Sequence, residues 1–429
     1  MIRKIVNTFA SNVFIALLNL IIAVVVSQYL GAEGKGGQSI LITNIALILL
    51  VCNIAGGASL VYLVPRGDNF RIIFLSYVWS FLVCLAVYAI MGFFLDIPAN
   101  YIFHICLLTL LSSLTAVNSS VLLGHERINA RNVVAILQTI VLLGALIVLF
   151  VGFDSKKLEA YIFALYLAYT FAFILSSLLI IRYTDLKPQT TSFRNIIKDM
   201  LHYGFLNQLS HIMQLLSFRM SYYILLIYLG KDSVGIYSNA VALVESVWLI
   251  SKSIATVQYA RIANTEDIKY GQELTRNLLK SALFVSFFLL LAMSLMPPAF
   301  FRLLFGQEFG QVNVLIITLS PGVFFYNFSL IIGHYFSGKG RYHINTVASA
   351  IGLAVTVGLC FLLVPVWGMY GAALAAVMSF LSTSYYVYYV FKRETNYSTA
   401  SFFANGRDIK SYYDNCMIFL KNKNETKNH

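Results

Sequence analysis

The chain has 429 residues, of which 59% are hydrophobic and only 11% are charged. Soluble domains carry about 25% charged residues, so this composition excludes a protein whose whole surface faces water. The formal net charge of +12 is explained by basic connections that face anionic lipid, and it does not indicate a nucleic-acid partner. The five cysteines lie singly and without a His-rich cluster, so we expect no disulfide, no metal site and no cofactor.

Apolar runs of about 20 residues, each long enough to cross roughly 30 Å of hydrocarbon, recur from the N-terminus to Arg393. The first run is too long for the core of a signal peptide, so we interpret it as a retained first span. We therefore predict an all-α polytopic membrane protein with about twelve transmembrane helices. The predicted spans are 12–30, 38–64, 72–95, 101–123, 133–152, 160–181, 203–229, 235–259, 278–301, 312–336, 343–364 and 369–391.

The 30 Lys and Arg residues are distributed unevenly over the predicted connections. Most of them lie in the tail or in connections that share a side with the N-terminus, such as Arg66 and Arg71 after span 2 and Lys339 and Arg341 after span 10. Cytoplasmic connections of membrane proteins are enriched in Lys and Arg. The pattern therefore predicts that both termini are cytoplasmic.

The longest internal connection separates span 6 from span 7 and divides the chain into two halves. We predict an N-terminal six-helix bundle in residues 1–182, a cytoplasmic linker in 183–202, and a C-terminal six-helix bundle in 203–393. A basic cytoplasmic tail, residues 394–429, follows. Apolar residues at helical spacing in the tail are typical of an amphipathic helix on the inner leaflet, although a disordered basic tail explains the composition equally well.

Two short patterns recur at equivalent places in the predicted halves. The first follows spans 1 and 7 and comprises Tyr29, Leu30, Gly31, Gly36 and Ser39 in one half and Tyr228, Leu229, Gly230, Gly235 and Ser238 in the other. The second follows spans 4 and 10 and comprises Gly124 and Arg127 in one half and Gly338 and Arg341 in the other. Two six-span halves that cross the membrane in the same direction predict a pseudo-two-fold axis along the membrane normal.

Ionisable and amide side chains are rare inside the predicted spans, and each is costly at bilayer depth unless it is paired or faces water. On span 7 they occupy about half of the helix circumference at 100° per residue, too much for lipid contact. On span 8 they form one narrow stripe, and span 1 has a milder one. The candidate binding residues are Asn12 and Asn19 in span 1, Asn207, His211, Gln214 and Arg219 in span 7, and Glu245, Lys252 and Tyr259 in span 8.

These side chains have two explanations. In the functional one, spans 1, 7 and 8 border a hydrated cavity in which Arg219, Lys252 and His211 present positive charge to an anionic group such as a phosphate. In the structural one, Arg219, Glu245 and Lys252 neutralise one another as a buried network, and the amides hold helices together. The width of the polar arc on span 7 favours the cavity.

Two other features have simpler explanations. His104 and His334 each lie alone near a span end, and we expect both to be ordinary residues of helix interfaces. Pro297-Pro298 and Pro321-Gly322 are expected to kink spans 9 and 10, because proline cannot supply the helix hydrogen bond.

The corner sequences resemble the polysaccharide-transporter branch of the multidrug/oligosaccharidyl-lipid/polysaccharide (MOP) flippase superfamily. The matching segments are Tyr29–Gly36, Tyr228–Gly235, Gly338–Arg341 and Gly368–Ala373, and the resemblance covers the chain to about Arg393. It implies two pseudo-symmetric six-helix bundles, as in multidrug and toxic compound extrusion (MATE) transporters, in a bacterial inner (plasma) membrane. Transport of this kind needs no covalent chemistry, so we do not expect an enzyme.

Within that superfamily the resemblance implies a flippase. Its cargo is expected to be an undecaprenyl-diphosphate-linked oligosaccharide, the repeat unit of an O-antigen or of a capsular or exopolysaccharide, moved to the outer leaflet by alternating access. In this hypothesis Arg219 and Lys252 hold the diphosphate, and Glu245 is the candidate ion-coupling group. The aromatic residues expected to stack on sugars are Tyr222, Tyr223, Trp248 and Tyr259. Expected partners are anionic membrane lipids, glycan polymerases and glycosyltransferases.

Two other functions remain as alternatives. A multidrug and toxin extrusion antiporter generally carries an embedded acidic residue in its first span, whereas span 1 here has only Asn12 and Asn19. A membrane polysaccharide polymerase is expected to have a substantial external loop with acidic, His or Arg groups, whereas the external connections here are short and nearly uncharged. Lipid-II flippases of the superfamily have a longer chain of fourteen spans with several arginines in the first two spans. The twelve predicted spans here, with only Arg3 near the start, argue against a peptidoglycan precursor as cargo.

Overall fold

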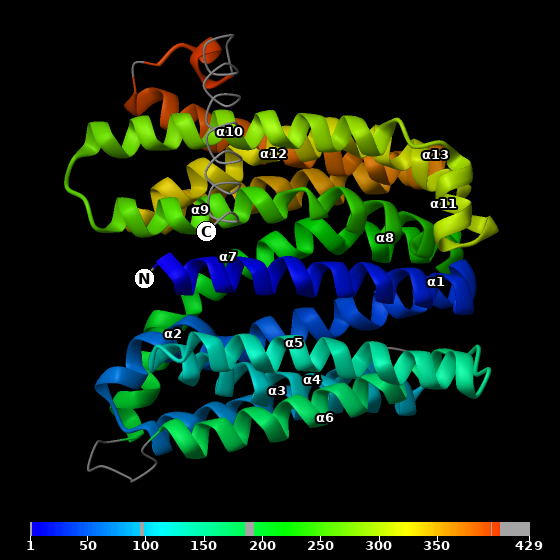
Figure 1. Cartoon of the computed structure of the whole chain (residues 1–429), viewed down its shortest axis with the longest axis horizontal. Coiled ribbons are helices and arrows are strands. Elements are labelled where there is room, and N and C mark those ends of the chain that lie inside the picture. Colours follow the sequence, from blue (N-terminus) through cyan, green and yellow to red (C-terminus); the bar gives the residue numbers. More distant parts are fainter. Residues whose placement is uncertain (1, 95–97, 185–192, 396, 404–429) are drawn as a thin grey trace, which may run out of the picture.

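The computed structural model describes residues 2–94, 98–184, 193–395 and 397–403. Their regular structure is helical, without a strand (Figure 1). The first half contains α1 (Ile2–Cys52), η1 (Asn53–Ala55), α2 (Gly57–Leu63), η2 (Val64–Arg66), α3 (Asn69–Phe94), α4 (Ala99–Gly124), α5 (Ile128–Ile147), the π-helical turn η3 (Val148–Gly152) and α6 (Leu158–Tyr183). The second half contains α7 (Phe193–Leu229), α8 (Lys231–Ser246), α9 (Trp248–Ala263), α10 (Ile268–Ser294), α11 (Pro298–Phe305), η4 (Gln307–Gln311), α12 (Val312–Gly338), α13 (Tyr342–Glu394) and η5 (Thr399–Phe402).

Nine helical units in the described part of the chain are long and apolar enough to span a membrane, and the bent pair α8 and α9 forms a tenth. Two of these units, the 60-residue Asn7–Arg66 and the 53-residue α13, measure about 90 and 80 Å at 1.5 Å per residue. Each is therefore long enough to cross twice. The ten units account for the twelve predicted crossings, and the chain is a multi-pass membrane protein.

The helical path reverses direction at single glycines. Gly31 bends α1 with φ 66° and ψ −169°, and Gly230 separates α7 from α8 with φ 82° and ψ −176°. Gly368 bends α13 with φ 57° and ψ −132°. Positive φ is accessible to glycine at no steric cost, so helical structure continues on both sides of each bend. The connections predicted after spans 1 and 11 are therefore found in place but are shorter than predicted, because one residue makes each turn.

The internal repeat is confirmed at both predicted places. Gly31 and Gly230 have nearly the same backbone conformation. After α4, the N–H of Arg127 donates to the carbonyl of Leu122 at 2.8 Å, and after α12 the N–H of Arg341 donates to that of Phe336 at 2.9 Å. The residue before each of these arginines has positive φ, 55° and 73° respectively. The two halves thus share both their corners and their turns.

Two predicted spans are interrupted. Span 2 is not continuous, because α1 ends at Cys52 and the next residues form the short helices η1, α2 and η2. Span 8 is bent by 42° between α8 and α9, which meet at Val247. The second span of each half is therefore broken, at roughly corresponding places.

Pro297 and Pro298 do not kink span 9 as predicted. Its helix α10 starts at Ile268 and ends at Ser294, and Pro298 opens the separate helix α11. Proline suits the first position of a helix, where its missing N–H has no partner in any case. The two prolines thus separate two helices instead of kinking one, whereas Pro321 lies inside α12, which continues through it.

Helix α7 connects the halves. It begins at Phe193, so residues 193–202 of the predicted linker are helical, whereas residues 185–192 and the tail from residue 404 lie outside the described part. The start of α7 packs against η1 and α2, and the rest of α7 packs against α13 and α8. Figure 1 shows α1 and α7 along the middle of the molecule, between the two groups of helices.

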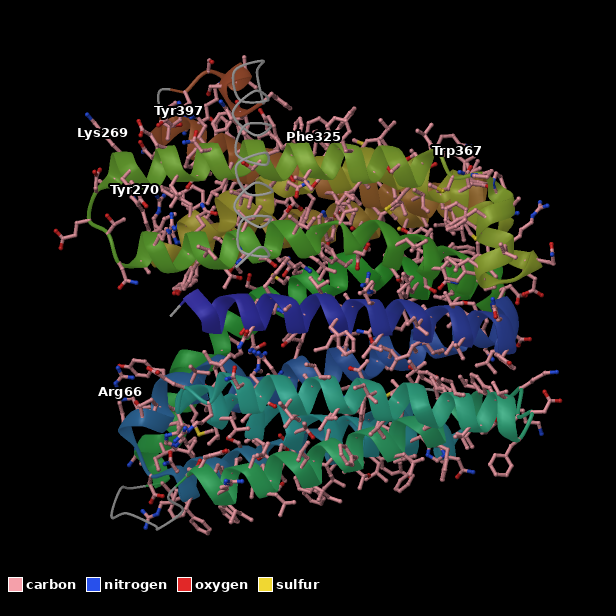
Figure 2. The ribbon with its side chains drawn as sticks, viewed as in Figure 1. Arg66, Lys269, Tyr270, Phe325, Trp367 and Tyr397 are labelled. Carbon is pink, nitrogen blue, oxygen red and sulfur yellow. The ribbon has the colours of Figure 1, made fainter. Side chains whose placement is uncertain are left out.

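The molecule has two ends, which we name by their contents. The corner end holds the bend within α1 and the junction of α7 with α8, and the terminal end holds the start of α1 and the connection between α9 and α10 (Figure 1). Figure 2 places Arg66 and Lys269, from different halves, at the terminal end and Trp367 at the corner end. Arg66 and Lys269, two of the basic residues that were expected on one side of the membrane, thus lie at the same end.

The halves meet at the corner end where α1 crosses α8. A Cβ atom added to Gly36 would lie 1.9 Å from the carbonyl oxygen of Lys231, and one added to Gly235 would lie 2.0 Å from that of Ala32. Both distances are far below van der Waals contact. Each half therefore contributes one glycine to a crossing that only glycine permits, and the contact is reciprocal.

Polar contacts extend this crossing toward the middle of the molecule. Ser39 donates to the hydroxyl of Ser238 at 2.8 Å, and the amide of Asn239 donates to Ser27 at 2.8 Å. Further along, the Tyr223 hydroxyl donates to the Asn44 side chain at 2.5 Å. These hydrogen bonds join α1 to α7 and α8, so the corner end is closed.

Candidate functional site

Arg219 and Glu245 form a two-pronged ion pair between α7 and α8. Nη1 of Arg219 donates to Oε1 of Glu245 at 2.8 Å, and Nη2 donates to Oε2 at 2.7 Å. The two side chains are only 22% and 18% exposed, and the guanidinium lies 5.3 Å from the ring centre of Tyr222. Parallel hydrogen bonds of this kind are among the strongest that proteins make. Arg219 is therefore neutralised, and both oxygens of Glu245 are occupied.

The stripe predicted on span 8 is divided between two helices. Glu245 lies in α8 and Lys252 in α9, and the 42° bend between these helices removes the simple seven-residue spacing. The structural alternative from the sequence is thus correct for Arg219 and Glu245. Lys252 does not take part in their pair.

Lys252 is an exposed cation in the membrane-spanning region. Its ammonium lies 5.9 Å from the ring centre of Trp248, and no acidic side chain in the described part of the chain lies within ion-pair distance of it. The hydroxyl of Thr256, one turn further along α9, donates to the carbonyl of Lys252 at 2.8 Å. A positive charge is thus available beside Thr256.

An aromatic cluster surrounds Trp248, the residue whose ring lies near the Lys252 ammonium. Trp248 packs against Tyr326, Phe380 and Phe218 with ring centres 4.7, 5.4 and 5.6 Å apart. Its indole N–H donates to the carbonyl of Val323 at 2.9 Å, and the side chain is fully buried. Trp248 therefore supports the site from within the core, and the prediction that it stacks on a sugar does not fit this structure.

Two tyrosines predicted to stack on sugars also make contacts within the protein. Tyr222 is 4% exposed and packs edge-on against Tyr237, and Tyr223 is bonded to Asn44. Tyr259, by contrast, is 37% exposed. Of the four aromatic candidates, Tyr259 has the accessible ring.

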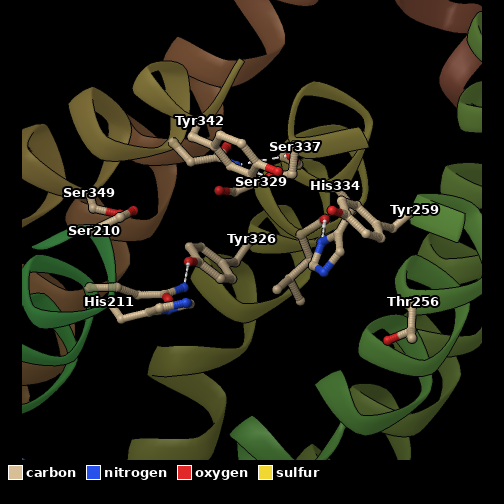
Figure 3. A pocket seen from close by; sticks show the side chains of 14 residues that line it. Ser210, His211, Thr256, Tyr259, Tyr326, Ser329, His334, Ser337, Tyr342 and Ser349 are labelled. Carbon is tan, nitrogen blue, oxygen red and sulfur yellow. Dashed lines mark hydrogen bonds between the residues drawn. The ribbon is translucent and has the colours of Figure 1, made fainter. Parts of the chain in front are cut away.

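A cavity of about 340 Å³ lies within the second half. It is bordered by α7, α9, α12 and α13 and includes the predicted residues His211, Gln214 and Tyr259 (Figure 3). The full lining is Ser210, His211, Gln214, Thr256, Tyr259, Tyr326, Ser329, Leu330, Gly333, His334, Ser337, Tyr342, Asn345 and Ser349. We call this space the C-half cavity. Thr256 belongs to its lining, so Lys252 lies one helical turn from it.

Hydrogen bonds fix several lining groups. The amide of Gln214 donates to the Tyr326 hydroxyl at 2.9 Å. The amide of Asn345 donates to the Gly333 carbonyl at 3.0 Å and to the Ser337 hydroxyl at 2.9 Å. Nδ1 of His334 lies 2.8 Å from the Leu330 carbonyl, which places its proton on Nδ1 and leaves Nε2 as an acceptor.

The asparagines of span 1 lie apart from this cavity. Asn12 and Asn19 are both exposed on α1 and share one side of the helix at 100° per residue, roughly opposite to the exposed Phe14 and Ile21. Neither contributes to the lining of the C-half cavity. The side chain of Asn207 lies outside the described residues.

Sequence reasoning missed half of the cavity. It treated His334 as an ordinary interface residue and did not select Tyr326, Ser329, Tyr342 or Asn345. The sequence feature that could have indicated these residues is the run of polar residues near the end of α12 and at the start of α13. That signal is weak, because hydroxyl and amide groups also occur in ordinary helix contacts of membrane proteins.

The fold is that of MOP-superfamily transporters. An inward-facing multidrug resistance MATE family transporter of that superfamily matches with a TM-score of 0.70 and 15% identity, covering 89% of this chain and 94% of that one. The lipid II flippase MurJ in an inward closed conformation matches with a TM-score of 0.72 and 14% identity, covering 92% and 89%. The MATE-like architecture and its two pseudo-symmetric bundles are thereby confirmed.

One curated relative matches part of the chain. The chain is 28% identical over 167 residues to the capsular polysaccharide biosynthesis protein CapF of Staphylococcus aureus, and the match covers 38% of this chain and 42% of that protein. The matched part thus spans less than half of the relative's length. No family model matches the chain.

Proposed function

We propose that this chain is a flippase that moves an undecaprenyl-diphosphate-linked oligosaccharide across a bacterial inner membrane by alternating access. The similarity to a capsular polysaccharide biosynthesis protein supports a polysaccharide precursor as cargo. The fold shared with a lipid II flippase supports a lipid-linked one. The moving bodies in this proposal are the bundles of residues 1–182 and 203–393.

The observation that carries the proposal is the free charge of Lys252. A diphosphate needs a cation that is not already neutralised, and Arg219 is held by Glu245. Lys252 is exposed, lies in the membrane-spanning region, and has no acidic side chain of the described part of the chain within ion-pair distance. In this mechanism Lys252 binds the diphosphate, and Arg219 fixes α7 to α8.

The closed corner end sets the direction of the cycle. We assign the corner end to the outer side and the terminal end, with Arg66 and Lys269, to the cytoplasmic side. The reciprocal glycine crossing then seals the outer side, and cargo enters from the cytoplasmic leaflet. Separation of α1 from α8 would open the outer side for release.

The first test is transbilayer movement of a fluorescent polyprenyl-diphosphate oligosaccharide in proteoliposomes. Lys252→Gln is expected to lower the rate at least about tenfold, because a hydrogen bond to a charged group contributes about 1.5–3 kcal/mol. Lys252→Arg keeps the charge and is expected to retain most of the movement. Lys269→Gln, which removes an exposed charge at the terminal end, is the matched control.

A drug antiporter is the competing function, because a multidrug transporter of the MATE family shares the fold. Its cargo is expected to be cationic and would be repelled by Lys252. If the unaltered protein moves no glycan lipid but lowers the accumulation of cationic dyes in cells, drug export replaces the proposed function. Equal rates for Lys252→Gln and the unaltered protein would remove Lys252 from the mechanism.

A further inference from the structure

The C-half cavity has the chemistry of a site for an uncharged, hydroxylated ligand. None of its fourteen lining residues, all of them described, is Asp, Glu, Lys or Arg. The lining instead offers hydroxyl, amide and imidazole groups, which both donate and accept hydrogen bonds. A drug cation would find no carboxylate there, and a diphosphate would find no fixed positive charge.

Aromatic rings provide the second half of this chemistry. Tyr259, Tyr326 and Tyr342 come from three different helices, α9, α12 and α13, and line the same space (Figure 3). Tyr259 and Tyr342 are 37% and 49% exposed, whereas Tyr326 is 3% exposed. An aromatic ring combines apolar area with a polar tip, which matches a sugar ring with apolar faces and a rim of hydroxyl groups.

The polar groups are held in place before any ligand arrives. Gln214 is bonded to Tyr326, and Asn345 spans from α13 to the Gly333 carbonyl and the Ser337 hydroxyl of α12. Since Ser337 accepts from Asn345, its own proton is free to be donated into the cavity. A site with fixed polar groups loses less entropy when it binds a ligand.

The size of the cavity limits what it holds. A volume of about 340 Å³ lies at the small end of the range of about 300–1,000 Å³ that is typical of ligand pockets. It suits about one or two sugar rings, and neither a whole repeat unit nor a polyprenyl chain. Lys252 lies one helical turn away on α9, so a phosphate bound there would place the adjacent sugar near the cavity.

We propose that the C-half cavity is a subsite for an uncharged sugar unit of the cargo, formed by the second half alone. The inference deepens the proposed function and rests on it, because the sugar arrives joined to the diphosphate that Lys252 binds. The sugar stays with one half while the other half moves, so the glycan travels as part of the second half. Specificity for the sugar depends on hydroxyl and amide groups of α7, α12 and α13.

The test is direct binding of free, uncharged mono- and disaccharides of glucose, galactose and N-acetylhexosamines to the full chain in nanodiscs, measured by saturation-transfer NMR. At least one sugar is expected to bind. Tyr342→Phe and Ser349→Ala should each weaken it about two- to tenfold, as expected for the loss of one hydrogen bond of about 0.5–1.5 kcal/mol. Ser329→Phe, which fills the cavity, should abolish binding. Tyr88→Phe, an exposed tyrosine in the first half, is the matched control.

Two sets of outcomes separate this inference from the proposed function. Absence of binding by every sugar, or binding that Ser329→Phe leaves unchanged, overturns the subsite. If flipping of the glycan lipid is observed and Ser329→Phe flips as fast as the unaltered protein, the function stands and the subsite falls. If sugars bind through the cavity but no glycan lipid moves, the subsite stands and the proposed function falls.

Discussion

The two halves are alike at their corners and different in the middle of the membrane. Gly31 and Gly230 take the same conformation, and Gly36 and Gly235 make the same reciprocal crossing. At equal distances from the two corner glycines, however, the first half has Leu20 and Ala46 where the second half has Arg219 and Glu245. Symmetry is thus kept where the halves touch and lost where the ion pair lies.

This difference assigns separate roles to the two regions. A crossing in which both backbones meet requires small residues on both sides, so both halves keep glycine there. The C-half cavity makes no such demand on the first half. Gln214 and His211, which line it, correspond by distance from the corner to Ile15 and Asn12. The repeat therefore supplies the frame, and the second half alone supplies this cavity.

The largest effect is expected when the ion pair is broken on one side. Glu245→Gln leaves the Arg219 guanidinium about a fifth exposed and without its carboxylate. Breaking a buried pair in this way costs about 3–5 kcal/mol, and the remaining exposure places the expected loss near the lower limit. The free energy of unfolding in mixed micelles measures it.

The matched control for this prediction replaces both members of the ion pair with the residues that the first half has at the corresponding positions. The double variant Arg219→Leu and Glu245→Ala installs the residues that the first half has at these places, and it is expected to recover most of the lost stability, since apolar replacement of a buried pair is often neutral. If the double variant is as unstable as Glu245→Gln, the second half does not tolerate the apolar residues that the first half has at these positions.

The next effect tests the symmetric region. In Gly36→Ala and Gly235→Ala the new Cβ atom would lie 1.9 and 2.0 Å from a backbone oxygen of the other half. Overpacking costs about 1–3 kcal/mol, which corresponds to about a 5- to 150-fold loss of the closed corner end. Spin labels on two exposed residues of different halves, Lys156 between η3 and α6 and Gln307 at the start of η4, measure the separation.

Comparing the two glycine substitutions tests the reciprocal crossing more strictly than either substitution alone. Both substitutions are expected to lengthen the distance between the labels by similar amounts, and Gly144→Ala, which meets open space, should not change it. A large effect from one glycine and none from the other would contradict the reciprocal crossing.

The corners were predictable from the sequence because one local property decides them. A glycine that follows a long apolar run and precedes another allows a reversal that other residues resist, and the same letters recur in both halves. The break at Val247 was not predictable in this way. Residues 235–259 contain no proline, and their only glycine is Gly235, far from the bend.

The candidate site shows the same limit. Helical periodicity correctly placed His211 and Gln214 on a polar face of α7, because both lie on one helix. It assumed a continuous helix between Glu245 and Lys252, whereas a 42° bend separates them. Tyr326 and Tyr342 belong to the cavity only because α13 packs against α7 and α12 packs against α13 and α9. That packing depends on residues far apart in the sequence, and a local sequence pattern does not predict it.

The smallest effect separates two residues that are equivalent in sequence. Ser39 donates to the hydroxyl of Ser238, and Ser238 donates to the carbonyl of Gly235. In Ser39→Ala the Ser238 hydroxyl keeps its acceptor, so the expected cost is about 0.5–1.5 kcal/mol. In Ser238→Ala the buried Ser39 hydroxyl loses its acceptor, so the expected cost rises to about 1–3 kcal/mol. The population of the closed corner end, measured with the same two labels, should fall further for Ser238→Ala. Equal losses would mean that the crossing is symmetric in its hydrogen bonds as well as in its backbone.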